Sequence, residues 1–360
     1  MSGLLAGLGR RALFTLDPET AHGLSIRALG SGMVPGCRAD RDPRLAVTIA
    51  GLEFPNPLGM AAGYDKNAEV AAELARLGFG FVEVGTLTPK AQPGNPRPRI
   101  FRLVRDQAVI NRLGFNNEGH AAAHARLSAQ RHKGILGVNI GANKDTEDRA
   151  GDYVAGIACF ADVADYFTVN ISSPNTPGLR NLQTRAALSE LLGRVLAERD
   201  AKQKRIPVFL KIAPDLTEPD LDDIAAECLA QRLDGVIVSN TTLSRTGLSA
   251  DPKAGEAGGL SGRPVFERST IVLAKMRQRL GKEMPLIGVG GIDSAETAAE
   301  KIRAGADLVQ LYTGFIYGGP LLPGRILRGL SAICDREKLA HLSDLRDAKT
   351  ADYAARAIPA

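Results

Sequence analysis

Residues 170–180 read NISSPNTPGLR and follow an apolar run directly, so polar groups are concentrated where a strand would end. Serine hydroxyls can move protons in a closed site, and asparagine amides can donate to and accept from a polar ring. Pro174, Pro177 and Gly178 would give the segment stiff arms and a pivot, which is typical of a lid. A surface turn needs some of these residues but not all of them together, so the composition favours a working loop.

Asparagines recur at similar places along the chain, namely Asn111, Asn139, Asn170, Asn175 and Asn240. Asparagine is poor strand material, and any one of these residues alone is more often a turn or a cap. Many amides that face one opening would instead suit a flat ring with alternating donors and acceptors.

Two lysines, Lys66 and Lys211, also stand where apolar runs end. A lysine at such a place usually just reaches solvent, but two that point into one cavity would favour an anionic ligand. The last two apolar runs end in Gly290-Gly291 and Thr313-Gly314. Backbone N–H groups at such glycines bind phosphate in some barrels, although glycines also simply terminate strands.

Eight near-continuous apolar runs must position these residues, and they lie at 57–62, 80–86, 135–140, 166–171, 207–212, 235–240, 285–290 and 307–312. Continuous rather than alternating apolar runs are typical of strands that are buried on both faces. Helical patterns separate most of the runs. Eight such units predict an α/β fold, a closed (β/α)8 barrel, because the alternative, a doubly wound open sheet, rarely needs eight.

Three of the helical patterns have clear boundaries. Residues 67–78 place apolar residues on one face and end at Gly78. Residues 293–305 begin with Asp293 and Glu296 in the spacing of a capping box and end at Gly305. A third helix should begin after Thr217.

Other stretches depart from this alternation. Residues 88–134 are too long for one crossover, and 99–115 predict an inserted hairpin that turns at Arg105-Asp106. The first 45 residues predict two short amphipathic helices, the second capped by Asp17 with Pro18 in its first turn. We therefore divide the chain into a helical extension (1–45), a barrel (46–340) and a polar tail (341–360) that is uninformative by itself.

Composition excludes several classes of function. The chain has 360 residues, of which 44% are hydrophobic, and a net charge of +5 that is spread along it, so no nucleic-acid site is expected. Its four cysteines are scattered without a CxxC pair, which predicts reduced thiols and no metal site: Cys37, Cys159, Cys228 and Cys334. No apolar run approaches the length of a membrane-spanning helix. The N-terminus does not read as a signal peptide, because Arg10-Arg11 follow its apolar stretch.

Taken together, the strings AAGYDK, NRLGFNN, GVNIGANK, NISSPNTPGLR, FLKIAPD, SNTT, GGLSG, GVGGI and YTG resemble the dihydroorotate dehydrogenase family, in order and over essentially the whole chain. Each string is weak alone, but their combination is specific. The resemblance implies a barrel that binds flavin mononucleotide (FMN) and oxidises (S)-dihydroorotate to orotate in pyrimidine synthesis.

Within that family, soluble class 1 members carry a cysteine as the base in this loop, and membrane-associated class 2 members carry a serine. Here the position is Ser173, and the N-terminal extension also resembles class 2. The resemblance thus implies a monomer on the cytoplasmic side of the cell (inner) membrane, with a membrane quinone, ubiquinone or menaquinone, as acceptor. Leu4, Leu5, Leu8 and Leu13 around Arg10-Arg11 fit a helix in a membrane interface, or equally one packed on the barrel.

The resemblance also implies roles for individual residues. FMN should contact Ala62, Gly63, Tyr64, Asp65, Lys66, Thr86, Asn139, Asn170, Lys211, Ser239, Gly262, Gly291, Tyr312 and Thr313. The orotate ring and carboxylate should contact Lys66, Asn111, Arg112, Leu113, Gly114, Phe115, Asn170, Asn175, Asn240 and Thr241. His22 and Arg102 resemble residues of the quinone tunnel, although a lone histidine on an amphipathic helix is more often simply interfacial.

The implied reaction removes a proton from C5 of dihydroorotate and a hydride from C6, which goes to flavin N5. An alcohol is a poor base, so we expect Ser173 to act with a water or threonine relay. Lys211 would stabilise charge on the reduced flavin. The alternatives are a flavin barrel that uses fumarate or a nicotinamide, a colourless aldolase or isomerase with a Schiff-base lysine, and a protein that merely binds a nucleotide.

Overall fold

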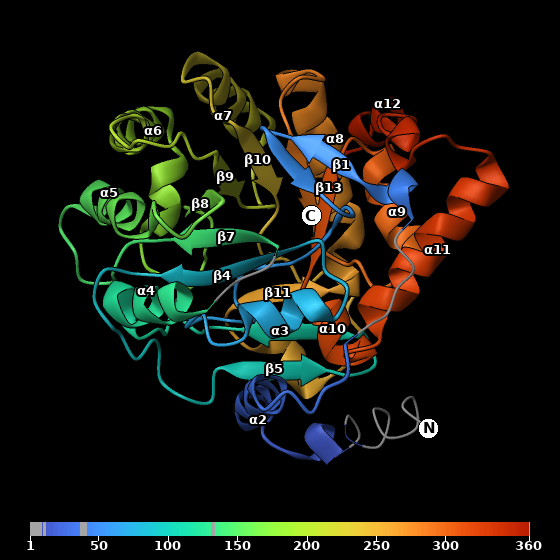
Figure 1. Ribbon diagram of the computed structural model, residues 1–360, viewed down its shortest axis with the longest axis horizontal. Coiled ribbons are helices and arrows are strands. Elements are labelled where there is room, and N and C mark those ends of the chain that lie inside the picture. Colours follow the sequence, from blue (N-terminus) through green and yellow to red (C-terminus); the bar gives the residue numbers. More distant parts are fainter. Residues whose placement is uncertain (1–8, 10–11, 37–41, 131–133, 360) are drawn as a thin grey trace.

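The computed structural model describes residue 9 and residues 12–36, 42–130 and 134–359. Eight parallel strands close into a barrel in the order β10-β12-β13-β3-β4-β7-β8-β9, with helices around it (Figure 1). These strands are β3 (Leu58–Met60), β4 (Phe81–Leu87), β7 (Ile135–Ile140), β8 (Tyr166–Asn170), β9 (Val208–Ile212), β10 (Gly235–Val238), β12 (Leu286–Val289) and β13 (Leu308–Leu311). Each lies within one predicted apolar run or extends one residue beyond it, so the barrel is confirmed and the open sheet is excluded.

Glycines and aromatic residues on neighbouring strands fill the barrel together. Gly59 pairs in register with Phe81, Gly137 with Tyr166, and Gly235 with Phe209. A Cβ at Gly137 would lie 2.1 Å from the Tyr166 ring, so each glycine makes room for the large side chain beside it. The result is a packed interior at the amino-terminal end of the strands.

A short hairpin that was not predicted covers this end of the barrel. It consists of β1 (Val47–Ile49) and β2 (Leu52–Phe54), paired antiparallel. The Phe54 ring packs edge-on against Phe81 at a centroid distance of 5.2 Å. The two strands have only three residues each, too short to give a clear periodicity.

The helices that surround the barrel follow its strands: α3 (Ala71–Arg76), α4 (Gly119–Ala129), α5 (Arg149–Phe160), α6 (Arg185–Asp200), α7 (Glu218–Ala230), α8 (Phe266–Leu280), α9 (Ala295–Arg303), α10 (Thr313–Gly318) and α11 (Leu322–Glu337). Short 3-10 turns complete the connections: η1 (Pro43–Leu45), η2 (Leu179–Gln183), η3 (Pro252–Gly255) and η4 (Arg263–Val265). Helix α7 begins after Thr217, as the sequence predicts, and Thr217 caps it in a capping box with Asp220.

Two predicted helix starts are wrong. In α9 the capping box joins Ser294 to Thr297, because the Asp293 carboxylate pairs with Arg263 instead. Helix α3 is shorter than the pattern at 67–78, because the Asp65 carboxylate accepts from the backbone N–H groups of Glu69 and Val70 and holds that stretch in a turn.

The inserted hairpin is confirmed as β5 (Ile100–Leu103) and β6 (Ala108–Asn111). A third strand, β11 (Gly259–Gly262), pairs antiparallel with β6 and was not predicted. Its sequence, GLSG, has too few β-branched or aromatic residues to indicate a strand.

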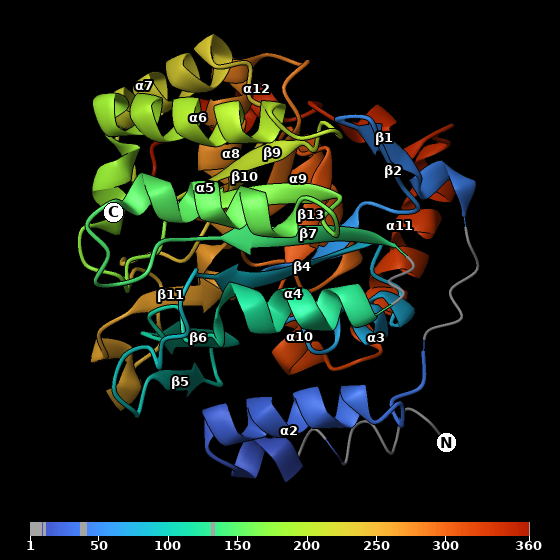
Figure 2. The ribbon, with the colours of Figure 1, turned by 60° about the vertical axis from the view of Figure 1, so that its left-hand side comes forward.

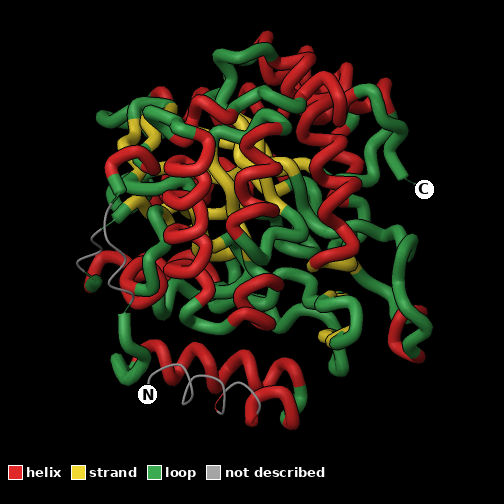
Figure 3. Tube along the Cα trace, turned by 90° about the vertical axis from the view of Figure 1, so that its right-hand side faces the viewer, coloured by secondary structure: helices red, strands yellow, loops and turns green. Residues whose placement is uncertain are grey.

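The N-terminal extension contains α2 (Pro18–Gly30), which Asp17 caps as predicted. Figures 2 and 3 show this helix lying across one end of the molecule, beside β5. Residues 12–15 are also helical, whereas Leu4, Leu5, Leu8, Arg10, Arg11 and Cys37 lie outside the described residues. None of the helices in the described ranges is both long and apolar enough to cross a membrane.

The tail is ordered, although its sequence held no useful signal. It forms η5 (Leu342–Leu345) and α12 (Thr350–Ala354), and α12 packs on α8. Tyr353 is buried, and Lys275 Nζ of α8 donates to the carbonyl of Ala354 at 2.8 Å. The tail is therefore part of the outer helical layer.

Candidate active site

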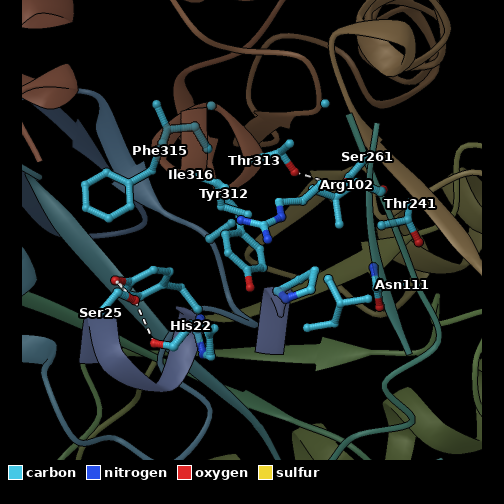
Figure 4. A pocket seen from close by; sticks show the side chains of 18 of the residues that line it. His22, Ser25, Arg102, Asn111, Thr241, Ser261, Tyr312, Thr313, Phe315 and Ile316 are labelled. Atoms are coloured by element: carbon cyan, nitrogen blue, oxygen red, sulfur yellow. Dashed lines mark hydrogen bonds between the residues drawn. The ribbon is translucent and has the colours of Figure 1, made fainter. Parts of the chain in front are cut away.

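A cavity of about 360 Å³ lies at the carboxyl ends of the barrel strands and continues to α2. Side chains from α2, from the β5–β6 hairpin and from α10 converge on it (Figure 4). The predicted site residues that line it are His22, Ala62, Tyr64, Arg102, Asn111, Leu113, Lys211, Ser239, Asn240, Thr241, Gly262, Gly291, Tyr312 and Thr313. Residues from both the predicted flavin site and the predicted quinone tunnel thus share one cavity.

One wall of the cavity consists largely of backbone. Gly262 and Gly291 have φ angles of +98° and +76°, which side chains rarely adopt. A Cβ at Gly291 would lie 2.4 Å from the Cβ of Phe266. Thr313 Oγ1 donates to Ser261 Oγ at 2.8 Å beside these glycines. A wall that consists largely of backbone fits a phosphate group, one of the two possibilities that the sequence raised for these glycines.

Lys211 enters the cavity from β9, between Asn170 of β8 and Ile237 of β10 in register. Its side chain is almost fully buried. Burial lowers the pKa of Lys211, and the carboxylate of Glu83 opposes that shift. The site therefore places a buried lysine side chain next to the backbone wall.

Behind the cavity, amide and hydroxyl groups form a chain of hydrogen bonds. Thr86 Oγ1 donates to Asn139 Oδ1 at 2.5 Å and accepts from Asn170 Nδ2 at 2.9 Å. Asn170 Oδ1 accepts from Ser172 Oγ at 2.8 Å, and Asn240 Nδ2 donates to Ser172 Oγ at 2.9 Å. These hydrogen bonds connect residues from four strand ends. The sequence could only suggest that these residues are neighbours.

The loop of residues 170–180 approaches the cavity from the other side. Ser173 is buried, and its Oγ accepts from the backbone N–H of Asn175 at 3.2 Å. Asn175 Nδ2 donates to Asn111 Oδ1 at 3.3 Å, and Asn111 lines the cavity. The predicted base and two of the predicted amides therefore lie in one group at the cavity edge.

Several predicted residues lie beside the cavity lining rather than in it. Gly63, with a φ angle of +103°, stands against Tyr312. Gln92 Nε2 donates to the carbonyls of Gly114 and Phe115, and so fixes that turn.

Three charged residues are also absent from the cavity lining. Arg112 pairs with Glu256 at 2.7 Å, and the Asp65 carboxylate is engaged by the backbone N–H groups described above. Burial raises the pKa of Asp65 to about 6 and lowers that of Lys66 to about 8.

The end of the cavity near α2 is mostly apolar. The His22 ring packs edge-on against Tyr64 at 5.2 Å, and Ser25 Oγ lies 2.9 Å from the Tyr64 hydroxyl. Arg102 lies over the ring of Phe14 and donates to the carbonyl of Leu13. Desolvation in this end, together with the charge of Lys66, lowers the pKa of His22 to about 3, so its imidazole is neutral at physiological pH.

Sequence reasoning missed one buried acid, Glu83, which projects into the barrel beneath Asn139 and accepts from Asn139 Nδ2 at 2.8 Å. A signal existed, because a glutamate interrupts the otherwise apolar run of β4. Within the described ranges, no group of histidine, cysteine and acidic side chains is arranged to hold a metal ion.

The model of the family described as dihydroorotate dehydrogenase matches residues 44–334. The chain belongs to the dihydroorotate dehydrogenase family. A protein of Rhizobium rhizogenes (strain K84 / ATCC BAA-868) named dihydroorotate dehydrogenase (quinone) is 67% identical over 362 residues, which cover 99% of this chain and 100% of the relative. The equally named protein of Brucella ovis (strain ATCC 25840 / 63/290 / NCTC 10512) is 68% identical over 361 residues and 99% of each chain.

Solved structures of the family agree with the fold. The ligand-free DHODH of Eimeria tenella superposes with a TM-score of 0.89 at 40% identity, over 92% of this chain and 99% of that one. The same enzyme in complex with ferulenol gives the same TM-score and identity. The dihydroorotate dehydrogenase family is flavin-dependent. The match to the family model begins at residue 44, after the end of α2. The relatives named dihydroorotate dehydrogenase (quinone) align with 99% of this chain, so they share the N-terminal extension.

Proposed function

We propose that this chain oxidises (S)-dihydroorotate to orotate with bound FMN and that a membrane quinone is the electron acceptor. The family and the full-length similarity to relatives named dihydroorotate dehydrogenase (quinone) support the reaction. The structural observation that carries the proposal is the shared cavity. One end of this cavity is lined by amides and by the wall at Gly262 and Gly291, which we call the glycine wall. The other end is apolar and is lined by α2.

The residues present fit FMN. The wall at Gly262, Gly291 and Thr313 would hold the phosphate through backbone and hydroxyl donors. Lys211 and Ser239 would contact the ring, with Thr86, Asn139 and Asn170 behind it. Bound there, FMN would supply the acceptor for the C6 hydride and deliver two electrons to the quinone. The buried Lys211 cation would favour negative charge on the ring.

Orotate and dihydroorotate each carry carbonyl groups, ring N–H groups and one carboxylate. Asn111 and Asn175, which are hydrogen-bonded to each other, and Asn240 with Thr241 would hold the ring. Lys66 would contribute a positive charge for the carboxylate.

Ser173 would take the proton from C5. Its oxygen already accepts from the Asn175 N–H, so the hydroxyl needs a second group to accept its own proton. Thr176, three residues further along the same loop, has a buried hydroxyl without a hydrogen-bond partner among the described residues. We assign Thr176 as the threonine of the relay, because an unpaired buried hydroxyl is costly unless it serves a function.

The apolar end of the cavity would admit the quinone between His22 and Arg102. Leu16, Leu24 and Met33 are exposed apolar side chains on or near α2. They would rest on the cytoplasmic side of the cell (inner) membrane, so that the protein binds peripherally and as a monomer. The first 45 residues thus form the membrane and quinone part, residues 46–340 the catalytic barrel, and 341–360 the tail.

A single spectroscopic experiment tests the proposal. The purified protein should be yellow, lose its colour when dihydroorotate is added without oxygen, and regain it with ubiquinone or menaquinone analogues. Fumarate and NAD should not restore the colour. A colourless preparation would disprove the flavin assignment, and reoxidation by fumarate would disprove the quinone assignment.

A further inference from the structure

Glu83 lies on β4 inside the barrel and is fully buried. Its carboxylate accepts hydrogen bonds from Asn139 Nδ2 at 2.8 Å, Tyr166 OH at 3.1 Å and Gln310 Nε2 at 2.8 Å. All three partners are donors, so the carboxylate oxygens of Glu83 act only as acceptors here. Gln310 leaves its own Oε1 without a partner while its amide nitrogen faces Glu83.

The role of Glu83 as an acceptor dictates the direction of the next hydrogen bonds. Because Asn139 must turn its NH2 group toward the carboxylate, its Oδ1 faces Thr86. The single hydroxyl proton of Thr86 is then donated to Asn139, so Thr86 can only accept from Asn170. The polarity of each bond follows from the one before it.

The same constraint reaches the cavity. Since Asn170 turns its NH2 group toward Thr86, its Oδ1 is directed to Ser172 and accepts from the Ser172 hydroxyl. The Ser172 oxygen is consequently free to accept from Asn240 Nδ2. Asn240 then presents its Oδ1 to the backbone N–H of Thr241 at 2.7 Å. Asn240 and Thr241 line the cavity, several residues away from the carboxylate.

We propose that Glu83 is a positioning residue that fixes which way the amide groups of Asn139, Asn170 and Asn240 face and thereby makes the site complementary to orotate. This inference rests on the proposed function. If the chain of bonds were reversed, the N–H and C=O groups would exchange places on the walls that meet the flavin and the pyrimidine ring. A ligand with a fixed pattern of donors and acceptors would then lose its partners.

The first variant is Glu83→Gln, which keeps the size of the side chain but lets it donate as well as accept. It should retain bound flavin and bind orotate at least about tenfold more weakly, because buried partners become mismatched. Titration of the flavin absorbance with orotate measures this dissociation constant without turnover. Tyr166→Phe is the matched control, since it removes another donor to the same carboxylate and leaves the chain to Asn240 intact. It should change the constant by less than about threefold.

A double-mutant cycle with Thr86→Val separates positioning from a general structural role. Valine has the shape of threonine but cannot relay a hydrogen bond, so Glu83→Gln should have no further effect on orotate binding in that background. Additive effects, parent-like binding by Glu83→Gln, or equal damage from Tyr166→Phe would each overturn the proposal.

If Glu83→Gln does not fold or hold flavin, Thr86→Ser and Thr86→Val decide. The valine variant should bind orotate at least about tenfold more weakly than the serine variant, which keeps the hydroxyl, and equal binding by both would overturn the relay. The unmutated protein tests the proposed function separately. If it lacks flavin, or if its flavin spectrum does not respond to orotate, the proposed function is wrong, whatever the role of Glu83.

Discussion

A serine hydroxyl is intrinsically a weak base, so the proposed role of Ser173 depends on its surroundings. Its hydroxyl is buried and is fixed from one side by the Asn175 N–H, so its chemistry depends on what accepts its proton. The buried hydroxyl of Thr176, in the same loop, is the candidate for that role. Catalysis by Ser173 would therefore come from position rather than from an intrinsically basic group.

Ser173→Ala should remain yellow and reduce its flavin about 10²–10⁴-fold more slowly with dihydroorotate, because the proton at C5 loses its acceptor. Rapid mixing without oxygen measures this half-reaction. Reoxidation by quinone serves as the internal control and should proceed at the parental rate. A variant that is reduced as fast as the parent would show that another group is the base.

His22 should make stability dependent on pH. Its pKa is about 3 in the folded chain, where burial disfavours the charged form, against an ordinary value of 6.5. Between these values the unfolded chain binds a proton that the folded chain does not. The free energy of unfolding should therefore fall as pH is lowered from 6.5 toward 3, by up to about 1.4 kcal/mol per pH unit for this group.

Denaturant titrations of the parent and of His22→Phe at pH 7 and pH 5 measure this effect. The loss of stability at pH 5 should be smaller in the variant, because phenylalanine does not titrate. The difference between the two proteins at pH 7 shows how much the substitution itself changes stability. Identical pH dependence in the parent and in His22→Phe would contradict a neutral His22.

At the scale of elements, one acidic side chain of α2 forms ion pairs with the segment that precedes β5. Glu19 accepts from Arg99 at 2.7 Å and from Arg97 at 2.9 Å. Burial alone would raise the pKa of Glu19, but the hydrogen bonds and charges of Arg99 and Arg97 outweigh it and lower the pKa. Arg99 is itself buried and also donates to the carbonyls of Pro93 and Asn95, so the base of the hairpin and α2 share this anchor.

Glu19→Gln should loosen α2 and slow reoxidation of the flavin by quinone about tenfold, because it weakens a charged contact to the largely buried Arg99. Reduction by dihydroorotate should be unaffected, since its proposed residues lie on the barrel and its loops. Arg27→Gln, an exposed change on the same helix, is the control. Equal slowing of both half-reactions would mean that Glu19 supports the whole site rather than the docking of α2.

The elements differ in how well they could be predicted. The barrel strands could be predicted because burial on both faces leaves a continuous apolar run. The start of α7 could be predicted after Thr217, which caps the helix. Strand β11 and helix α12 were not, because GLSG and the polar tail carry no periodicity of their own and are ordered by their neighbours.

The site shows the same contrast. Its amides were recognised at strand ends, but Glu83 was missed and Arg112 turned out to pair with Glu256. Whether a polar residue faces the interior, the cavity or a salt bridge depends on strand orientation and on partners that are distant in the sequence. The sequence therefore places a residue at the cavity most easily where its position on the backbone alone decides, as at Gly262 and Gly291.

At the scale of the whole molecule, the barrel and the N-terminal extension contribute to one cavity but should be separable. A chain that begins near residue 45 should retain FMN and be reduced by dihydroorotate, because the glycine wall, Lys211 and the amides all belong to the barrel. It should lose reduction of quinone and binding to anionic lipid vesicles. Flavin content, the two half-reactions and co-sedimentation with vesicles measure these effects.

The full-length chain is the control for this truncation. Undiminished quinone kinetics in the shortened chain would remove the proposal that α2 forms the quinone site. Loss of flavin would show instead that the extension supports the barrel itself.

The wall that α2 supplies to the cavity also has a pharmacological consequence. His22 and Ser25 lie before residue 44, where the match to the family model begins, while the glycine wall and the amides lie within it. A compound that fills the α2 end would therefore contact residues that family membership does not specify. An inhibitor aimed there can be selective for one organism, whereas a mimic of the pyrimidine would be expected to act across the family.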